Sequence, residues 1–250
     1  MFEKNNIIEF LYPKDQKKIL EDVFPIPTKL NLPDWFKKLK YTIKDQSIRG
    51  CVPFMDTLTS GYILKMPQDF YVKHNFVNDK QERDSIYRFS YQDFSNFIWQ
   101  KANLNTINPQ VHHPKQLGEK CPFHNKNKNL SYYKILNPFL IKTPPGYSCL
   151  FTPPLNNRDD RFEIISGIVD TDKFPNYINF PIIINGDKYP ELETTIERGL
   201  PYVQVIPFKR ENWKMEIKPM SENHNNLFLQ GTKKIMHTYK TFFWSKKTWN

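Results

Sequence analysis

Glycine is scarce in this sequence, which has 8 glycines and 20 prolines in 250 residues. An average protein contains about 7% glycine and about 5% proline, so the usual balance is reversed here. A proline in the interior of a helix costs about 3 kcal/mol. The composition therefore excludes an architecture of long helices, and proline is expected to mark where most elements end.

Cysteine and long apolar runs are also rare. The three cysteines, Cys51, Cys121 and Cys149, are odd in number and far apart, which favours a reducing compartment over a disulfide framework. No apolar run approaches the roughly 20 residues of a membrane-spanning helix. Acidic residues interrupt the apolar stretch at positions 1–10, where a secretory signal would lie. We expect a cytoplasmic protein that is not secreted, has no transmembrane segment and binds no membrane.

Aromatic residues and positive charge are abundant. The 20 Phe, 13 Tyr and 5 Trp supply more buriable surface than a disordered chain carries, and the length suits one large domain or two small ones. The 36 Lys and Arg exceed the 26 Asp and Glu, which gives a net charge of +10. Residues 231–250 contain five lysines and no acid, so half of that surplus lies in the C-terminal tail.

The first part of the chain reads as an irregular arm over residues 1–45. Prolines punctuate it, and short helical pieces are predicted at 14–22 and 32–39. The second piece has a proline at its start, an acid in its first turn and lysines in its last turn, which suits the helix dipole.

The rest of the chain divides into a strand-rich block and a C-terminal part. Residues 46–210 carry short alternating runs, beginning near position 51, that are typical of strands. A polar excursion at 100–134 interrupts them and is long enough to be functional. Residues 211–250 are expected to form a helix, over 227–249, that ends in the basic tail.

Three segments in the second half follow one another in a recognisable order. Ile141–Pro154 contains a Pro-Pro-Gly turn that feeds a strand, and Ser166–Asp172 places a glycine before an Ile-Val pair. Ile196–Ile206 follows, with Gln204 on the opposite strand face from its valine neighbours. In this order they resemble the dUTPase and dCTP deaminase superfamily, whose barrel has a Pro-Pro-Gly turn, a Gly-Val-Ile-Asp segment and a Gly-Asp-Arg-Ile-Ala-Gln strand. The resemblance covers about residues 138–210.

The resemblance implies a mainly β (α+β) fold, in which a dUTPase-like β-clip barrel over 46–210 is flanked by the irregular N-terminal arm and the C-terminal helix. Families with this barrel commonly form trimers, so the implied partners are copies of the chain, with a trimer favoured, or other assembly subunits. The chain also resembles an uncharacterised family found mainly in phage and bacterial genomes, which implies a phage protein located in the host cytoplasm or the virion. The residues that carry this are Leu32–Lys37, Cys51–Asp56, Lys142–Phe151 and Gln204–Glu211.

The phosphate-binding chemistry of the superfamily is missing from this chain. Where the dUTPases have Pro-Arg-Ser-Gly, this sequence has Pro-Pro-Leu-Asn at 153–156. The glutamate that serves the deaminases as general base has no counterpart at 178–181. The resemblance with these departures implies a non-enzymatic structural or binding module that needs no cofactor.

A nucleotide pyrophosphohydrolase or a deaminase-like enzyme is the alternative. Asp170 and Asp172 are its catalytic candidates, because a pair of carboxylates can bind Mg²⁺ or activate water. Tyr147, Asp170 and Gln204 are the residues expected to line its ligand site. The same aspartates can instead accept hydrogen bonds from the amides of their own turn.

Two further clusters carry candidate chemistry. Cys121 and His124 have the spacing of paired zinc ligands, and His112 lies nearby, so the three are candidate metal ligands or polar loop residues. The C-terminal tail interleaves lysines with aromatic residues, as surfaces that bind nucleic acids do, or else forms an amphipathic helix that packs its aromatic side chains inward. Its candidate nucleic-acid contacts are Lys233, Lys234, Lys240, Trp244, Lys246 and Lys247.

Overall fold

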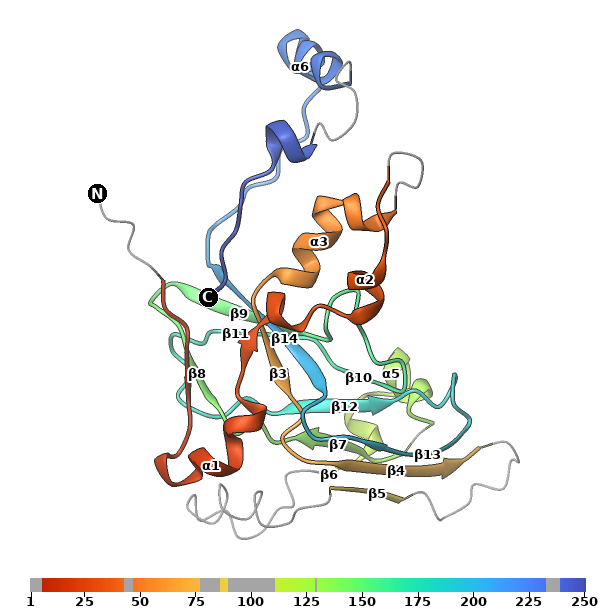
Figure 1. The fold of residues 1–250 in the computed structure, drawn as a ribbon. Helices are drawn as coiled ribbons and strands as arrows, with labels where there is room; N and C mark the ends of the chain where they lie inside the picture. The colour runs from red at the N-terminus through yellow and green to blue at the C-terminus, as the bar shows by residue number, and fades with distance from the viewer. Residues whose placement is uncertain (1–5, 43–46, 77–85, 90–110, 129, 233–238) are drawn as a thin grey trace.

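The computed structural model describes residues 6–42, 47–76, 86–89, 111–128, 130–232 and 239–250. Over these residues the chain is mainly β with a few short helices, so the predicted α+β class is confirmed (Figure 1). The strands are β1 (Glu9–Leu11), β2 (Ile26–Pro27), β3 (Tyr62–Lys65), β4 (Phe70–Asn75), β5 (Ile86–Phe89), β6 (Val111–His112), β7 (Tyr132–Ile135), β8 (Leu140–Lys142), β9 (Tyr147–Thr152), β10 (Phe162–Ile164), β11 (Gly167–Val169), β12 (Phe180–Ile184), β13 (Glu191–Ile196) and β14 (Pro201–Lys209). The helices and helical turns are η1 (Lys14–Gln16), α1 (Lys17–Leu20), η2 (Glu21–Val23), η3 (Thr28–Asn31), α2 (Asp34–Lys38), η4 (Ile48–Gly50), α3 (Val52–Thr59), η5 (Pro114–Gln116), α5 (Pro122–Lys126), α6 (Glu222–Thr232) and a π-helical turn, η6 (Tyr239–Phe243).

A five-stranded antiparallel sheet in the order β11-β9-β14-β3-β2 lies at the centre of the fold. The long strand β14 pairs with β9 on one side and with β3 on the other. Gly61, directly before β3, has a φ of +69°, and a Cβ atom at this position would collide with the carbonyl oxygen of Val205 in β14. Glycine is therefore required there for β3 and β14 to approach each other.

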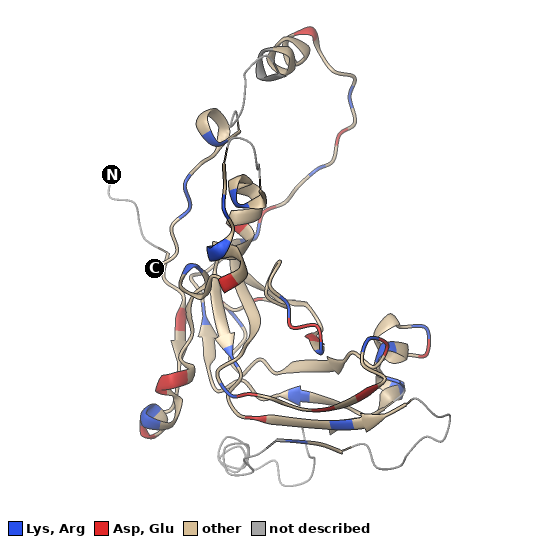
Figure 2. Ribbon diagram, turned by 45° about the vertical axis from the view of Figure 1, so that its right-hand side comes forward, with Lys and Arg blue, Asp and Glu red and all other residues tan. Residues whose placement is uncertain are grey.

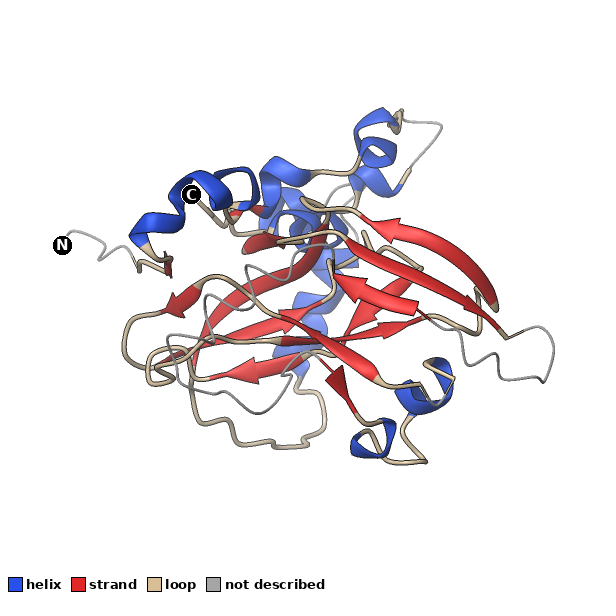
Figure 3. Ribbon diagram, turned by 90° about the horizontal axis from the view of Figure 1, so that it is seen from below, coloured by secondary structure: helices blue, strands red, loops and turns tan. Residues whose placement is uncertain are grey.

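One hydrophobic core connects the sheets. It joins the five-stranded sheet to a four-stranded sheet, β10-β12-β7-β6, and a three-stranded sheet, β13-β4-β5. Leu64 of β3, Val72 of β4, Ile135 of β7, Ile182 of β12 and Val205 of β14 are all buried in it. Figure 3 shows that the strands make up the body of the molecule and that the short helices lie around them. Among the described strands, no sheet closes on itself into a barrel.

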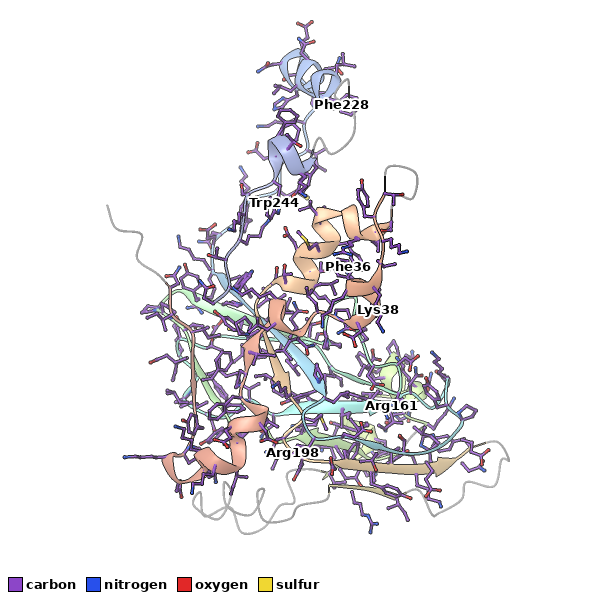
Figure 4. All side chains as sticks on the ribbon, in the orientation of Figure 1. Phe36, Lys38, Arg161, Arg198, Phe228 and Trp244 are labelled. Carbon is purple, nitrogen blue, oxygen red and sulfur yellow. The ribbon has the colours of Figure 1, made fainter. Side chains whose placement is uncertain are left out.

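The N-terminal arm is attached to this body. The predicted helical pieces are confirmed by the run from η1 to η2 and by α2, which follows Pro33. Strand β1 pairs with β8, and Leu20 and Val23 are fully buried. The guanidinium of Arg198 (Figure 4) donates hydrogen bonds to the carboxylate of Asp22 at 2.8 and 2.7 Å, which joins the arm to the segment between β13 and β14.

Helix α3 lies where the alternating pattern predicts strands, so that prediction is wrong for this segment. Pro53 suits the first turn of a helix, where its missing N–H costs nothing. The hydroxyls of Thr57 and Thr59 donate to carbonyl oxygens of the preceding turn at 2.7 and 3.0 Å, which accommodates these β-branched residues in a helix. The strands predicted after it are confirmed by β3 and β4.

The described part of the polar excursion belongs to the body of the fold. It supplies β6, α5 and the start of β7, and β7 lies inside the four-stranded sheet. Buried Asn127 accepts a hydrogen bond from the backbone N–H of Ile184 at 3.2 Å and donates one to the carbonyl of Leu130 at 2.8 Å. Buried polar side chains with partners of this kind explain how a polar segment can occupy an interior position. Residues 100–110 lie outside the described residues.

A C-terminal helix is present, but it begins earlier and ends sooner than predicted. An extended segment, 211–221, leads from β14 to α6, and the chain returns through η6 to the body (Figure 1). The outgoing limb is the segment 211–221, and the returning limb is the part that begins with η6. Figure 2 shows the two limbs well separated. We call the described residues 211–232 and 239–243 together the C-terminal loop. Residues 244–250 are not helical.

Candidate functional site

The two candidate carboxylates lie in the turn after β11, and both contact Arg210. The carboxylate of Asp172 accepts hydrogen bonds from the Arg210 guanidinium at 2.8 and 2.5 Å and from the backbone N–H of Gly146 at 2.8 Å. Asp170 accepts a hydrogen bond from the hydroxyl of Ser148 at 2.6 Å, and its carboxylate lies 3.3 Å from Arg210. The aspartates are close together, as the sequence predicts, and they share a cation.

This ion pair fixes the charge of Asp172. Hydrogen bonds from Arg210, together with the one from Gly146, hold the pKa of Asp172 well below its usual range. The same contact raises the pKa of Arg210. A general base works best with a pKa near the operating pH and an oxygen that is free to accept the substrate's proton. Asp172 is ionised far below that pH and its side chain is only 5% exposed, so its contacts are those of a structural anion that joins the turn before β9 to the end of β14.

Gln204 is fully buried and uses its amide group for internal hydrogen bonds. The amide nitrogen donates to the carbonyl oxygens of Thr57 and Ser60 at 2.9 and 2.7 Å. The amide oxygen accepts from the backbone N–H of Leu155 at 2.8 Å. Both donors and the acceptor are engaged. Gln204 thus joins β14 to the end of α3 and to the loop after β9.

The structure does not bring Tyr147, Asp170 and Gln204 together. The hydroxyl of Tyr147 accepts a hydrogen bond from the side-chain amide of Asn6 at 2.7 Å. The register of β14 and β9 places Gln204 four residues along the sheet from Ser148, the residue that contacts Asp170. At about 3.3 Å per residue, this separation is about 13 Å. A ligand that contacts all three residues would therefore have to span two distant points on one sheet.

Aromatic rings fill the interior behind β9. The rings of Phe151 and Phe180 have centroids 5.4 Å apart, and that of Tyr202 lies 5.7 Å from Phe180. All three side chains are buried. Burial raises the pKa of the neighbouring Cys149 thiol to about 11, so this cysteine is a protonated core residue at neutral pH.

The candidate metal ligands lie in one region but do not converge. His112 contacts the side chain of Gln116 at 2.9 Å, and the buried ring of His124 contacts the carbonyl oxygen of Pro114 at 3.4 Å. Cys121 precedes α5. In the part of the chain that the structure describes, no group of three or more His, Cys, Asp or Glu side chains is arranged to hold a metal ion.

The end of the C-terminal tail is docked on the body. The indole N–H of Trp244 and the ammonium of Lys247 donate to the carboxylate of Asp56 in α3, at 3.1 and 2.7 Å. Lys29 donates to the side chain of Asn250 at 2.8 Å. Figure 4 shows Trp244 close to α3. Two of the proposed nucleic-acid contacts are therefore engaged within the chain.

The other tail candidates are placed differently. Lys240 and Lys246 are exposed. Lys233 and Lys234 lie outside the described residues.

The C-terminal loop exposes an unusual amount of apolar surface. Trp213, Met215 and Ile217 alternate with polar residues along its extended segment, and they are 88%, 83% and 88% exposed. Figure 4 shows Phe228 on α6, at the end of the loop farthest from the body. The other exposed apolar residues of the loop are Met220, Leu227, Phe228, Leu229, Tyr239, Phe242 and Phe243. Single exposed apolar residues are ordinary, so the unusual feature is their number within one segment of the chain.

A second apolar surface lies at the edge strand β11. Ile168 in its centre is 64% exposed, and Phe174 beside it is 39% exposed. A shallow hollow of about 500 Å³ follows the strand, lined by Ile168, Val169, Asp170, Lys173, Phe174 and Pro175.

Sequence reasoning missed Arg210 and Asp56, which hold the site and the tail. Arg210 lies in Gln204–Glu211, one of the segments that carry the resemblance to the phage and bacterial family, but its partner Asp172 is 38 positions away. Asp56 and Lys247 are 191 positions apart. The sequence shows that Arg210 and Asp56 are charged, but it contains no signal that identifies their partners.

Comparison of the chain with protein-family models, with curated proteins and with solved structures finds no match in any of the three. Among the described residues, no helix has the length and apolar character needed to cross a membrane.

Proposed function

We propose that this protein is a non-enzymatic structural or binding module with a dUTPase-like β-clip fold, encoded by a phage, that works as a subunit of an oligomeric assembly such as a virion. A homotrimer is the favoured form. Copies of the chain or other subunits of the assembly are its partners.

The β-clip part of the proposal is supported by the placement of the three motif segments. The Pro-Pro-Gly turn leads into β9, the Gly-Ile-Val segment is β11, and the strand with Gln204 is β14. These strands are hydrogen-bonded neighbours in the order β11-β9-β14. Segments that resemble the superfamily in sequence order are thus also adjacent in space.

The non-enzymatic part is supported by the state of the polar residues. Asp172 and Asp170 contact Arg210, and Gln204 has its hydrogen bonds inside the fold. Arg161, an arginine near the missing phosphate motif, is paired with Asp159 at 2.7 Å. A nucleotide would have to displace these contacts before it reached Arg161 or Arg210.

The observation that carries the assembly proposal is the C-terminal loop. Its exposed aromatic and aliphatic residues amount to on the order of 1,000 Å² of apolar surface, since one aromatic side chain alone can bury 150–250 Å². A standard interface buries about 800 Å² on each partner. A loop with this surface is accounted for by a partner that covers it.

Two measurements test the proposal. Sedimentation at a series of concentrations should show self-association, or complex formation when purified subunits of the same assembly are added. Either result should be lost in the triple variant W213S/M215S/I217S. Pyrophosphate and ammonia release from a panel of nucleoside triphosphates with Mg²⁺ should stay at background. Turnover that disappears in Asp170→Asn would overturn the non-enzymatic assignment, and a protein that stays monomeric and binds no subunit would overturn the assembly role.

A further inference from the structure

The outgoing limb of the C-terminal loop has the pattern of a strand but belongs to no sheet. Trp213, Met215 and Ile217 alternate in sequence with Lys214 and Glu216, along a segment with no assigned secondary structure. Alternation of apolar and polar residues is typical of a strand with one face buried. Here the three apolar side chains are open to solvent, and the central one, Met215, is 83% exposed.

The edge strand β11 offers the complementary surface. Its sequence, Gly-Ile-Val, carries no charge, and Ile168 continues an apolar row across the sheet because it lies opposite Leu150, which lies opposite Ile206. Natural edge strands are usually protected by charge or proline. The described edge β13 has glutamates, one of them paired with Lys73, and β2 contains a proline. Among the described edges, β11 combines an uncharged strand with an adjoining hollow.

Residues 213–217 cannot all lie along this edge in their own chain, because Trp213 is too close to Arg210. Arg210 is fixed by Asp172 and by its backbone N–H, which donates to the carbonyl of Gly146 at 2.8 Å. A strand added outside β11 would lie three strand spacings from β14, about 14 Å to the side. Trp213 is three residues beyond Arg210, and three residues span at most about 10 Å. Figure 1 shows the limb running away from the sheet.

We propose that residues 213–217 of one copy add as a strand to β11 of a second copy, with Trp213, Met215 and Ile217 packed along Ile168 and the hollow beside it. This names the partner and the contact within the assembly proposed above, and it rests on that proposal. The main chain supplies the pairing, as in other cases of strand addition, and alternate side chains supply the selectivity. Both surfaces carry charges of both signs: the hollow has Asp170 and Lys173. In the limb, Glu216 is ion-paired with Lys214 and Lys218.

Disulfide trapping between two differently labelled chains tests the contact. In a C51S/C121S background, one chain carries Ile168→Cys and the other carries a cysteine at a single position from 213 to 217. Directly opposed residues of paired strands lie about 4.5–5.5 Å apart at Cβ, within the range that a disulfide can join. We expect cross-linked dimers with cysteines at 213, 215 or 217 and none at 214 and 216. This period of two distinguishes a paired strand from a loose apolar contact.

The control acceptor is Glu191→Cys, at the exposed start of the edge strand β13. It should give no cross-link with any limb position. Equal yield at all five positions, or cross-linking to 191 instead of 168, overturns the strand addition. If no position cross-links while sedimentation still shows association that depends on Trp213, this inference fails and the assembly role stands.

A second measurement does not depend on engineered cysteines. Ile168→Lys should weaken self-association by about tenfold or more, because it places a charge in the apolar contact. Ile19→Lys, at another exposed isoleucine, is the matched control and should leave it unchanged. Equal association constants for the two variants would overturn the proposal.

Discussion

A single arginine, Arg210, contacts both of the candidate catalytic aspartates. Arg210 contacts Asp172, Asp170 and the hydroxyl of Ser148, which it meets at 3.0 Å. The same carboxylates without the arginine would be free to bind Mg²⁺ or to activate water. What a pair of aspartates does therefore depends on a residue that comes from another strand.

The lowered pKa of Asp172 makes folding stability depend on pH. A carboxylate whose pKa falls on folding, from its usual 3.8, stabilises the fold fully above that value and loses the contribution as the pH falls. We therefore expect the melting temperature of the wild type to fall more steeply than that of Asp172→Asn between about pH 5 and pH 2. Above this window the wild type should be the more stable protein.

Thermal unfolding across this pH range, followed by circular dichroism, provides the measurement. Asp34→Asn is the control, because Asp34 makes only an exposed ion pair with Lys37. Parallel curves for the wild type and Asp172→Asn would contradict the assigned role.

At the scale of elements, the pairing of β3 with β14 depends on Gly61. Gly61→Ala and Gly199→Ala both place a Cβ at a positive φ, +69° and +88°. The alanine at 61 also meets the carbonyl of Val205, whereas no atom lies within 4 Å at 199. We expect Gly61→Ala to cost about 1–3 kcal/mol more than Gly199→Ala. Chemical denaturation of both variants measures the difference, and equal costs would show that the close approach of the strands is not limiting.

The elements also show what the sequence can and cannot predict. Helix α2 and the turn before β9 could be predicted, because proline, glycine and the end charges determine them locally. Helix α3 could not, because its threonine and aromatic content is typical of a strand and the hydroxyl contacts that favour the helix become evident only in three dimensions.

The candidate site was also only partly predictable from the sequence. The strand alternation correctly placed Gln204 opposite its valine neighbours, and proximity of Asp170 to Asp172 follows from their spacing. The partners of these residues, Leu155, Thr57 and Arg210, come from distant segments. Local sequence contains no information on such contacts. The sequence therefore could not show that these residues form an internal hydrogen-bond network and not a ligand site.

On the scale of the whole molecule, apolar attraction and net charge oppose each other. In the proposed assembly, copies that carry a charge of +10 repel, whereas the apolar residues of one C-terminal loop are expected to attract β11 of another copy. Added NaCl screens the repulsion, and sulfate strengthens apolar contacts. We expect the association constant to rise with NaCl and to rise further with ammonium sulfate at equal ionic strength.

Sedimentation equilibrium in the two salts measures this dependence. The variant W213S/M215S/I217S should lose the response while keeping the melting temperature of the wild type, because these side chains are 83–88% exposed. Association that weakens as NaCl is added would point instead to ionic contacts, and would contradict an apolar interface.

The docking of the tail on Asp56 has a consequence for the cost of binding. A loop held at both ends samples fewer conformations than a free tail of the same length, so less conformational entropy remains to be lost when a partner orders it. Trp244 and Lys247 thus lie outside the proposed interface but still affect it: by holding the returning limb, they restrict the directions in which the outgoing limb can present its apolar residues.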